Sequence, residues 1–175
     1  MAEEVRAYRY VGPPEVRAVV RPDEAGWVAG TQDDVAAWLR GCAVAEAREP
    51  FTFVIDLGGS LRLAARRSEH VACAGGEPVL SAGEIAFGAG PNGLAVTEVT
   101  NQSTGYCPEA SSWPAVADAL DRAGVAHPGR FTDEFVFRRC LRCGERNVVR
   151  DGDFTCAICD AELPASWNFD VSAER

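Results

Sequence analysis

The chain has 175 residues, of which 47% are hydrophobic and 25% are charged, and its formal net charge is −9. This composition is typical of a folded globular protein and excludes a disordered chain. The acidic charge excludes a generally basic nucleic-acid-binding body. No apolar run approaches the roughly 18 residues that span a bilayer, and the acidic start has no secretory-signal pattern. We therefore expect a cytoplasmic protein with no membrane partner. Because all 17 basic residues are arginine, we expect a high-GC bacterial source.

The first part of the chain predicts two short strands and a helix. The strands are expected at residues 3–11 and 16–21, on either side of a Gly-Pro-Pro break. The segment TQDDVAAWLRG predicts a helix that begins after the capping residue Thr31 and ends at Gly41. Its buried stripe is expected to contain Val35, Trp38 and Leu39.

Two hairpins and a second helix follow. Residues 51–56 and 61–65 are rich in β-forming side chains and flank a glycine turn, and residues 83–88 and 94–100 repeat this pattern. The segment SSWPAVADALDRAG predicts a helix with Ser111 or Ser112 as its cap, Pro114 in its first turn and Gly124 at its end. A strand at FTDEFVFRR then leads into the last part of the chain.

Four of the seven cysteines form two closely spaced pairs near the C-terminus. They are Cys140, Cys143, Cys156 and Cys159, with two residues inside each pair and twelve between the pairs. This spacing predicts one tetrahedral metal site, because each pair can turn both sulfurs toward a single ion. Gly144 suits the positive φ that such a turn needs. The other three, Cys42, Cys73 and Cys107, are expected to be small buried residues in a reducing compartment.

The paired cysteines resemble those of the zinc ribbon family, over about residues 136–170. Rubredoxins use two similar knuckles to hold iron, but their knuckles lie much further apart in sequence, so zinc is preferred. Four thiolates close the coordination shell, and the expected Zn²⁺ is therefore structural. We predict an α+β fold: a mostly antiparallel β-domain with two helices over residues 1–130, then a zinc ribbon over residues 131–175, packed on it through Leu163, Trp167 and Phe169. Residues 131–175 are called the cysteine module below.

A second group of reactive residues lies between positions 66 and 108. His70 has the chemistry of a general base or acid that Glu69 or Glu84 could orient. Ser103 or Cys107 could serve as a nucleophile, and Tyr106 as a hydrogen-bond donor. The predicted catalytic residues are therefore His70, Glu84, Ser103 and Tyr106, and the predicted ligand-binding residues are Arg67, Glu69 and Asn101. The alternative is structural: Glu84 and Asn101 would bond backbone groups at strand ends, and His70 would be a satisfied core residue.

This region resembles a β-rich module of bacterial polymorphic toxins and effectors. That module has a histidine, then Gly-x-Pro-Val-x-x-Ala-Gly-Glu, then Ser-Gly-His-Tyr-x-Pro. His70, the segment GEPVLSAGE at residues 76–84 and the segment STGYCP at residues 103–108 occupy the matching places. The module's second histidine is absent, because Gly105 precedes Tyr106. The resemblance implies a site but no substrate.

Three functions stay open at this point. The first is a zinc-stabilised module that binds or regulates an unknown protein or small molecule. The second is a hydrolase or transferase of effector type that uses His70, Glu84 and Tyr106 in one pocket. The third is nucleic-acid binding through the segment RRCLRCGERNVVR, which carries five arginines and one glutamate. The third requires these arginines to share an exposed face.

Overall fold

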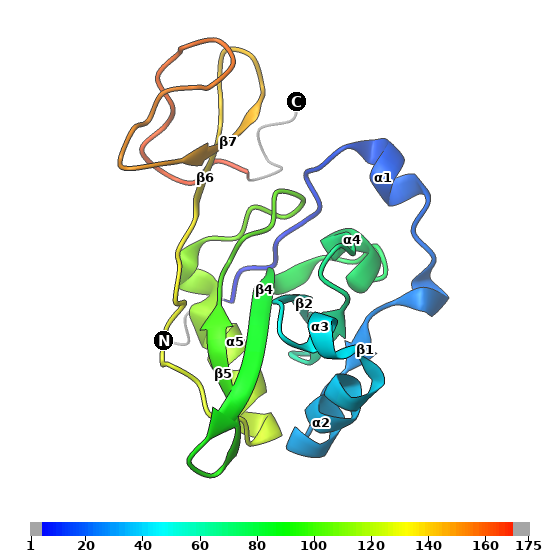
Figure 1. Ribbon diagram of the computed structural model, residues 1–175. Coiled ribbons are helices and arrows are strands. Elements are labelled where there is room, and N and C mark those ends of the chain that lie inside the picture. Colours follow the sequence, from blue (N-terminus) through cyan, green and yellow to red (C-terminus); the bar gives the residue numbers. More distant parts are fainter. Residues whose placement is uncertain (1–4, 170–175) are drawn as a thin grey trace.

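A five-stranded antiparallel sheet forms the centre of the molecule (Figure 1). The computed structural model describes residues 5–169. The strand order is β1-β3-β2-β4-β5, and the two predicted hairpins are neighbouring strand pairs within it. The fold is α+β, as predicted. The strands are β1 (Trp27–Val28), β2 (Phe51–Asp56), β3 (Leu61–Ala64), β4 (Val79–Gly90) and β5 (Gly93–Val99).

The two predicted helices are the longest helices in the described part of the chain. They are α2 (Gln32–Gly41) and α5 (Trp113–Ala123). In α2, the Thr31 hydroxyl accepts the Asp34 N–H and the Asp34 carboxylate accepts the Thr31 N–H, which forms the predicted cap. Three shorter helices are α1 (Pro14–Ala18), α3 (Val44–Ala47) and α4 (His70–Cys73), and two 3-10 turns lie at Pro22–Glu24 and Ala110–Ser112.

Three local predictions were wrong. Residues 16–21 do not form a strand, because α1 begins at Pro14, whose fixed φ and missing N–H suit the first helical turn. Residues 5–11 of the first predicted strand form no strand either: Tyr8 makes a single bridge to Val79, and residues 3 and 4 lie outside the described residues. Ser112 does not cap α5, since its hydroxyl donates to the Glu109 carbonyl and also meets the Ser81 hydroxyl.

Both faces of the sheet are covered, which explains why five of the six residues of β2 are buried. Phe53 and Ile55 point to one face, where they pack in one core with Val116 and Leu120 of α5. Val54 points to the other face, as strand alternation requires. There it packs with Val71 of α4 and with Tyr8, Val79 and Tyr106.

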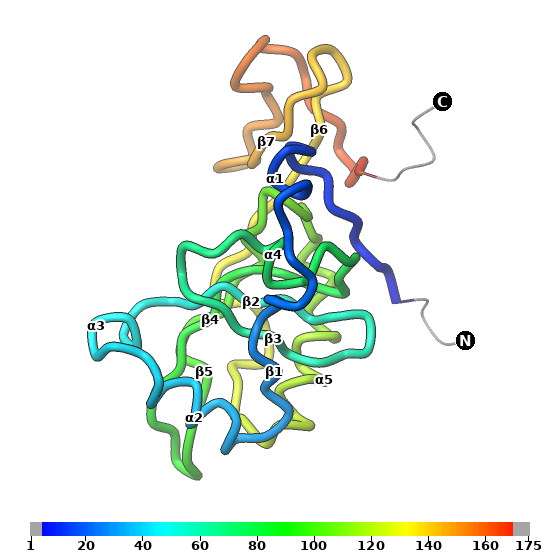
Figure 2. Tube along the Cα trace, turned by 90° about the vertical axis from the view of Figure 1, so that its right-hand side faces the viewer, coloured from blue at the N-terminus to red at the C-terminus, as the bar shows by residue number. Residues whose placement is uncertain are grey.

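The cysteine module lies at one end of the molecule (Figure 1). It contains a two-stranded antiparallel sheet of β6 (Val136–Arg139) and β7 (Arg146–Val149). Arg150 and Asp153 then pair across a tight turn of Asp151 and Gly152, which both have positive φ. Figure 2 shows the segment before α1 running along the main part of the molecule toward this module. None of the helices in residues 5–169 is long and apolar enough to cross a membrane.

Candidate functional site

The four paired cysteines come together in the cysteine module. The Sγ atoms of Cys140 and Cys159 lie 3.6 Å apart, as do those of Cys143 and Cys156. All four Sγ atoms lie within 4.8 Å of one another. A tetrahedral site with Zn–S distances of about 2.3 Å requires sulfurs about 3.8 Å apart. The four thiols therefore fit a single metal ion of this size, and soft sulfur ligands suit zinc.

The two cysteine pairs are held by the same backbone pattern. The N–H of Cys140 donates to the Glu145 carbonyl at 2.8 Å, and the N–H of Cys156 donates to the Ala161 carbonyl at the same distance. The residue after each pair, Gly144 or Asp160, has positive φ and donates its N–H back to the first cysteine's carbonyl. The prediction of a positive φ at Gly144 is confirmed, and Asp160 adopts a positive φ at the equivalent position although it is not a glycine.

Asn147 of β7 supports the second pair from outside the ligand set. Its side-chain amide lies 3.5 Å from the Cys156 sulfur, and its carbonyl oxygen accepts the Ala157 N–H at 2.9 Å. The Ile158 N–H also points at this sulfur and, with smaller contributions that include Asn147, lowers the pKa of the Cys156 thiol to about 6. The sequence analysis did not identify Asn147. Its place between the pairs was the only available signal, since buried polar partners of metal ligands have no fixed spacing.

Trp167 and Phe169 fasten the cysteine module to the rest of the molecule. The indole N–H of Trp167 donates to the Cys107 carbonyl at 2.8 Å, and its ring meets the Tyr8 ring edge-on at 5.6 Å. Phe169 and Phe137 pack with Cys107 in one cluster. Leu163 instead packs inside the module against Cys140 and Cys156. Two of the three residues expected at this contact therefore lie there.

Three of the five arginines in the segment RRCLRCGERNVVR, residues 138–150, are used to hold the fold. Arg138 is only 9% exposed, and its guanidinium donates to the carbonyls of Phe137, Pro164 and Ala165. Arg139 bonds the Gly144 carbonyl, and Arg146 reaches the Thr104 carbonyl. Of these five arginines, Arg142 and Arg150 are exposed. The five arginines do not share an exposed face, so the condition set for nucleic-acid binding is not met.

His70 is bonded to the main chain of β4. Its Nε2 donates to the Gly83 carbonyl at 2.8 Å, and burial lowers the pKa of the imidazole below its usual value. Gly83 is packed so closely that a Cβ there would lie 1.9 Å from the Thr100 carbonyl oxygen. The adjacent Glu84 is partly exposed, and its N–H bonds the Thr100 hydroxyl. Glu69 is exposed just before α4.

Tyr106 and its neighbours form a tight turn whose polar groups bond the backbone. The Tyr106 hydroxyl donates to the Glu77 carbonyl at 2.7 Å, and burial raises its pKa. The Ser103 hydroxyl accepts the Tyr106 N–H. Burial raises the pKa of the Cys107 thiol to about 12, which keeps it protonated and unreactive. Cys73 is likewise buried, and Cys42 is partly buried.

Asn101 is a structural link between the sheet and the cysteine module. It is fully buried, its amide donates to the carbonyls of Pro108 and Phe135, and its oxygen accepts the Phe135 N–H at 2.7 Å. Within residues 5–169, no hydrogen bond joins any two of His70, Glu84 and Tyr106. The polar residues of the 66–108 region are therefore near in sequence but bond separate parts of the backbone.

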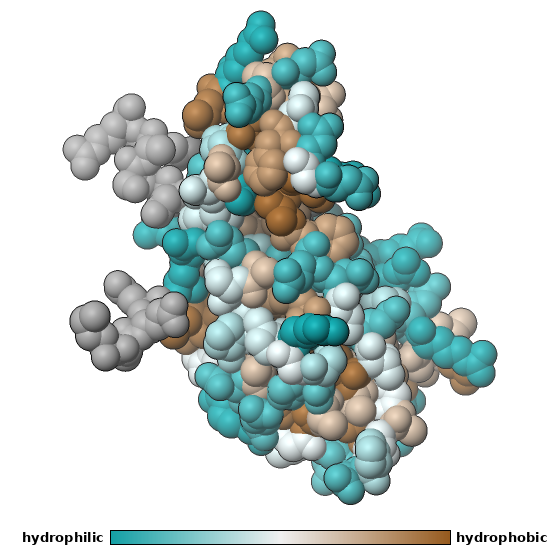
Figure 3. Space-filling view, turned by 90° about the vertical axis from the view of Figure 1, so that its left-hand side faces the viewer, coloured by the Kyte–Doolittle hydropathy of each residue, from teal (hydrophilic) through white to brown (hydrophobic). Residues whose placement is uncertain are grey.

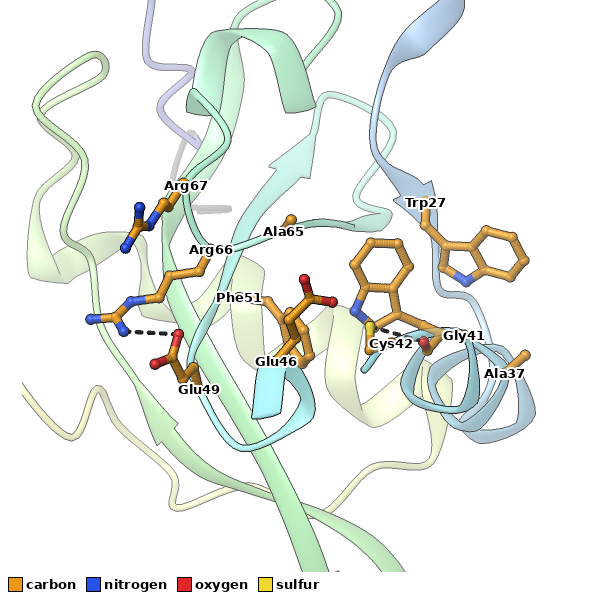
Figure 4. Close-up of a pocket in the computed structure, with 11 residues that line it drawn as sticks. Trp27, Ala37, Gly41, Cys42, Glu46, Glu49, Phe51, Ala65, Arg66 and Arg67 are labelled. Atoms are coloured by element: carbon orange, nitrogen blue, oxygen red, sulfur yellow. Dashed lines mark hydrogen bonds and ion pairs between the residues drawn. The ribbon is translucent and has the colours of Figure 1, made fainter. Parts of the chain in front are cut away.

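A cavity of about 500 Å³ lies beside this region, between α2, α3 and the ends of β2 and β3 (Figure 4). We call it the aromatic pocket, after Trp27, Trp38 and Phe51, which line it together with the predicted ligand-binding residue Arg67. The Trp38 ring lies 6.4 Å from that of Trp27 and 5.7 Å from that of Phe51. The charged residues of its lining are Glu46, Glu49, Arg66 and Arg67. The sequence analysis placed Trp38 only in a core stripe and so missed this pocket.

No protein-family model, curated protein or solved structure matches this chain. The similarity to the toxin module therefore rests on the sequence pattern alone. In the structure, His70, Gly83 and Tyr106 of that pattern make close backbone contacts.

Proposed function

We propose that this is a cytoplasmic, zinc-stabilised binding protein, in which a structural Zn²⁺ holds the cysteine module and the aromatic pocket takes a small molecule. The four converging thiols are the observation that carries the metal assignment. Zinc is preferred to iron because only twelve residues separate the two pairs. Four reduced thiols also suit the reducing cytoplasm.

The metal would act on structure rather than on a reaction. Four thiolates fill a tetrahedral shell and leave no position for water or substrate. The hydrophobic cluster around the thiols is small: apart from Cys140 and Cys156, Leu163 is its one buried member among the described residues. Metal binding would therefore supply much of its folding free energy. In this proposal residues 1–130 and 131–175 are two structural units, and Trp167 joins them.

Binding is favoured over catalysis by the state of the polar side chains. His70, Asn101, Ser103 and Tyr106 each bond the backbone. A catalytic set needs a nucleophile within hydrogen-bond reach of its base. The side chains of these four residues bond backbone groups and not each other. The aromatic pocket, by contrast, has a volume in the range of small-molecule sites.

Metal content and chelation test the zinc part. We expect one zinc per chain, and we expect loss of zinc and of module structure in Cys143→Ser and Cys159→Ser. Cys42→Ser is the matched control, because Cys42 lies outside the cluster. Elemental analysis and the absorbance of a metal-binding dye measure the release. Full zinc retention in both ligand variants would contradict the assignment.

Ligand-observed NMR with a set of small aromatic compounds tests the binding part. We expect several compounds to bind at millimolar concentration or below and to lose binding in Trp27→Ala. Trp113→Ala is the control, since Trp113 packs away from the pocket, against Phe131. The binding part is wrong if no compound depends on Trp27.

A further inference from the structure

We infer that the aromatic pocket selects an organic cation, an ammonium or guanidinium group carried on an apolar or aromatic body. This inference rests on the proposed binding function and names its ligand class. Two features carry it: a fixed aromatic wall and a carboxylate whose charge is not paired.

The aromatic wall consists of Trp27, Trp38 and Phe51. Trp27 is its exposed member, with 45% of its surface accessible, while Phe51 is buried. Its indole N–H donates to the Asp34 carbonyl at 3.2 Å, which ties the ring to the first turns of α2. Phe51 and Trp38 meet edge-on behind it. A ligand would therefore meet aromatic surfaces that are already ordered, and cations are attracted to the faces of such rings.

The charges around the pocket are not equivalent. Arg66 and Glu49 pair with each other at 3.0 Å across one rim. Glu46 makes no ion pair among the described residues, and one of its oxygens accepts only the Ala43 N–H at 3.3 Å. Figure 4 shows the Glu46 carboxylate between Trp27 on one side and Arg66 on the other. The uncompensated charge next to the aromatic wall is therefore negative.

Arg67 is the lining charge that favours an anionic ligand instead, and its orientation argues against such a ligand. It also makes no ion pair among residues 5–169, so an anionic ligand has one candidate partner. Its guanidinium is turned away from Trp27 in Figure 4, however. An anion bound at Arg67 would not contact the aromatic wall. The net charge of −9 also attracts cations to the molecule as a whole.

Three probes that share one ring and differ in their polar end test the inference: phenethylamine, phenethyl alcohol and phenylacetate. Calorimetry or ligand-observed NMR near neutral pH gives their affinities for the full chain loaded with zinc. We expect the amine to bind about tenfold more tightly than the alcohol, and the carboxylate to bind most weakly.

Two charge-neutralising variants at the same pocket sharpen the test. Glu46→Gln keeps an oxygen for the Ala43 N–H and should lower amine affinity about tenfold, to the level of the alcohol. Arg67→Gln should leave amine affinity unchanged or raise it slightly. Glu162→Gln, exposed on the cysteine module, is the distant control and should change nothing.

The outcomes separate the two proposals. Tightest binding of phenylacetate, lost in Arg67→Gln, overturns the cation inference and leaves the binding function standing. Equal binding of all three probes, lost in Trp27→Ala, also overturns the cation inference and leaves the binding function standing. If no probe binds and no compound of the aromatic set depends on Trp27, both the inference and the binding function are wrong.

Discussion

At the scale of single residues, Gly83 shows how a position can be demanded by packing alone. A Cβ at this residue would lie 1.9 Å from the Thr100 carbonyl oxygen, and the colliding atom belongs to the main chain, which cannot move aside cheaply. We expect Gly83→Ala to lower the free energy of unfolding by about 3 kcal/mol or more, or to prevent folding. Urea unfolding followed by circular dichroism measures this.

Gly41 is the matched control for that variant. A Cβ there meets nothing within 4 Å, and the residue is the last of α2. Gly41→Ala should therefore be neutral or slightly stabilising, because alanine favours helix more than glycine does. Equal stability of the two variants would show that β4 does not approach Thr100 closely.

The buried His70 predicts how the stability of the fold depends on pH. Burial lowers the pKa of its imidazole in the folded state, while in the unfolded chain the group titrates near its usual value of about 6.5. Below that pH the unfolded chain takes up a proton before the folded chain does. This contribution to stability is therefore present above about pH 6.5 and is lost as the pH falls, by at most about 1.4 kcal/mol per pH unit.

The comparison with His70→Gln isolates this effect. Protonation of the cysteine thiolates also weakens stability at low pH, but it acts equally on both proteins and cancels in their difference. We expect the wild type to lose more stability than the variant between about pH 7 and pH 5.5. Parallel profiles would mean that His70 titrates normally in the folded protein.

At the scale of elements, the cysteine pairs depend on β7 as well as on their own turns. Asn147 bonds both the Cys156 sulfur and the Ala157 N–H, so it orients the second pair. Supporting residues of this kind typically change metal affinity by about tenfold to a hundredfold. Asn147→Ala should therefore release zinc to a chelating dye faster and at lower dye concentration.

Asn92→Ala is the control for this prediction. Asn92 is exposed in the turn between β4 and β5, so it should behave as the wild type. A normal release rate in Asn147→Ala would show that the Cys156 pair is ordered by its backbone alone.

The elements themselves were predictable to the extent that their signals are local. The helices α2 and α5 and the hairpins β2–β3 and β4–β5 have caps, glycine turns and apolar spacing within a few residues. The strand prediction for residues 16–21 was wrong because Pro14 starts a helix there, although the composition of the segment favours a strand. The prediction that Ser112 caps α5 was wrong because its hydroxyl bonds the Ser81 hydroxyl, 31 residues earlier in the chain.

At the scale of the whole molecule, the cysteine module and the N-terminal segment share one aromatic contact. Trp167 meets Tyr8 and bonds Cys107, and Val11 donates its N–H to the Gly105 carbonyl beside it. Trp167→Ala should remove this joint while the four thiols keep their metal. We expect a loss of about 3 kcal/mol in unfolding free energy and faster hydrogen exchange at the Val11 and Cys107 amides.

The matched comparison is Trp27→Ala, which removes a tryptophan at the pocket. It should leave exchange at Val11 and Cys107 unchanged. Slow exchange at both amides in Trp167→Ala would show that the module is held by other contacts. Figure 3 shows hydrophobic residues on the module itself, and among its described residues Leu141 and Ile158 are the most exposed large apolar side chains.

Sequence patterns were sufficient to predict the four-cysteine cluster, the two long helices and the α+β class, because spacing, capping and alternation act over a few residues. Tertiary packing set the partners of the polar residues between positions 66 and 108. His70 meets Gly83, and Asn101 meets Phe135 34 residues away. It also decided that Arg138 is buried and that Trp27, Phe51 and Glu46 share a pocket. Such partners are set by how sheet, helices and module pack, and no local pattern encodes them.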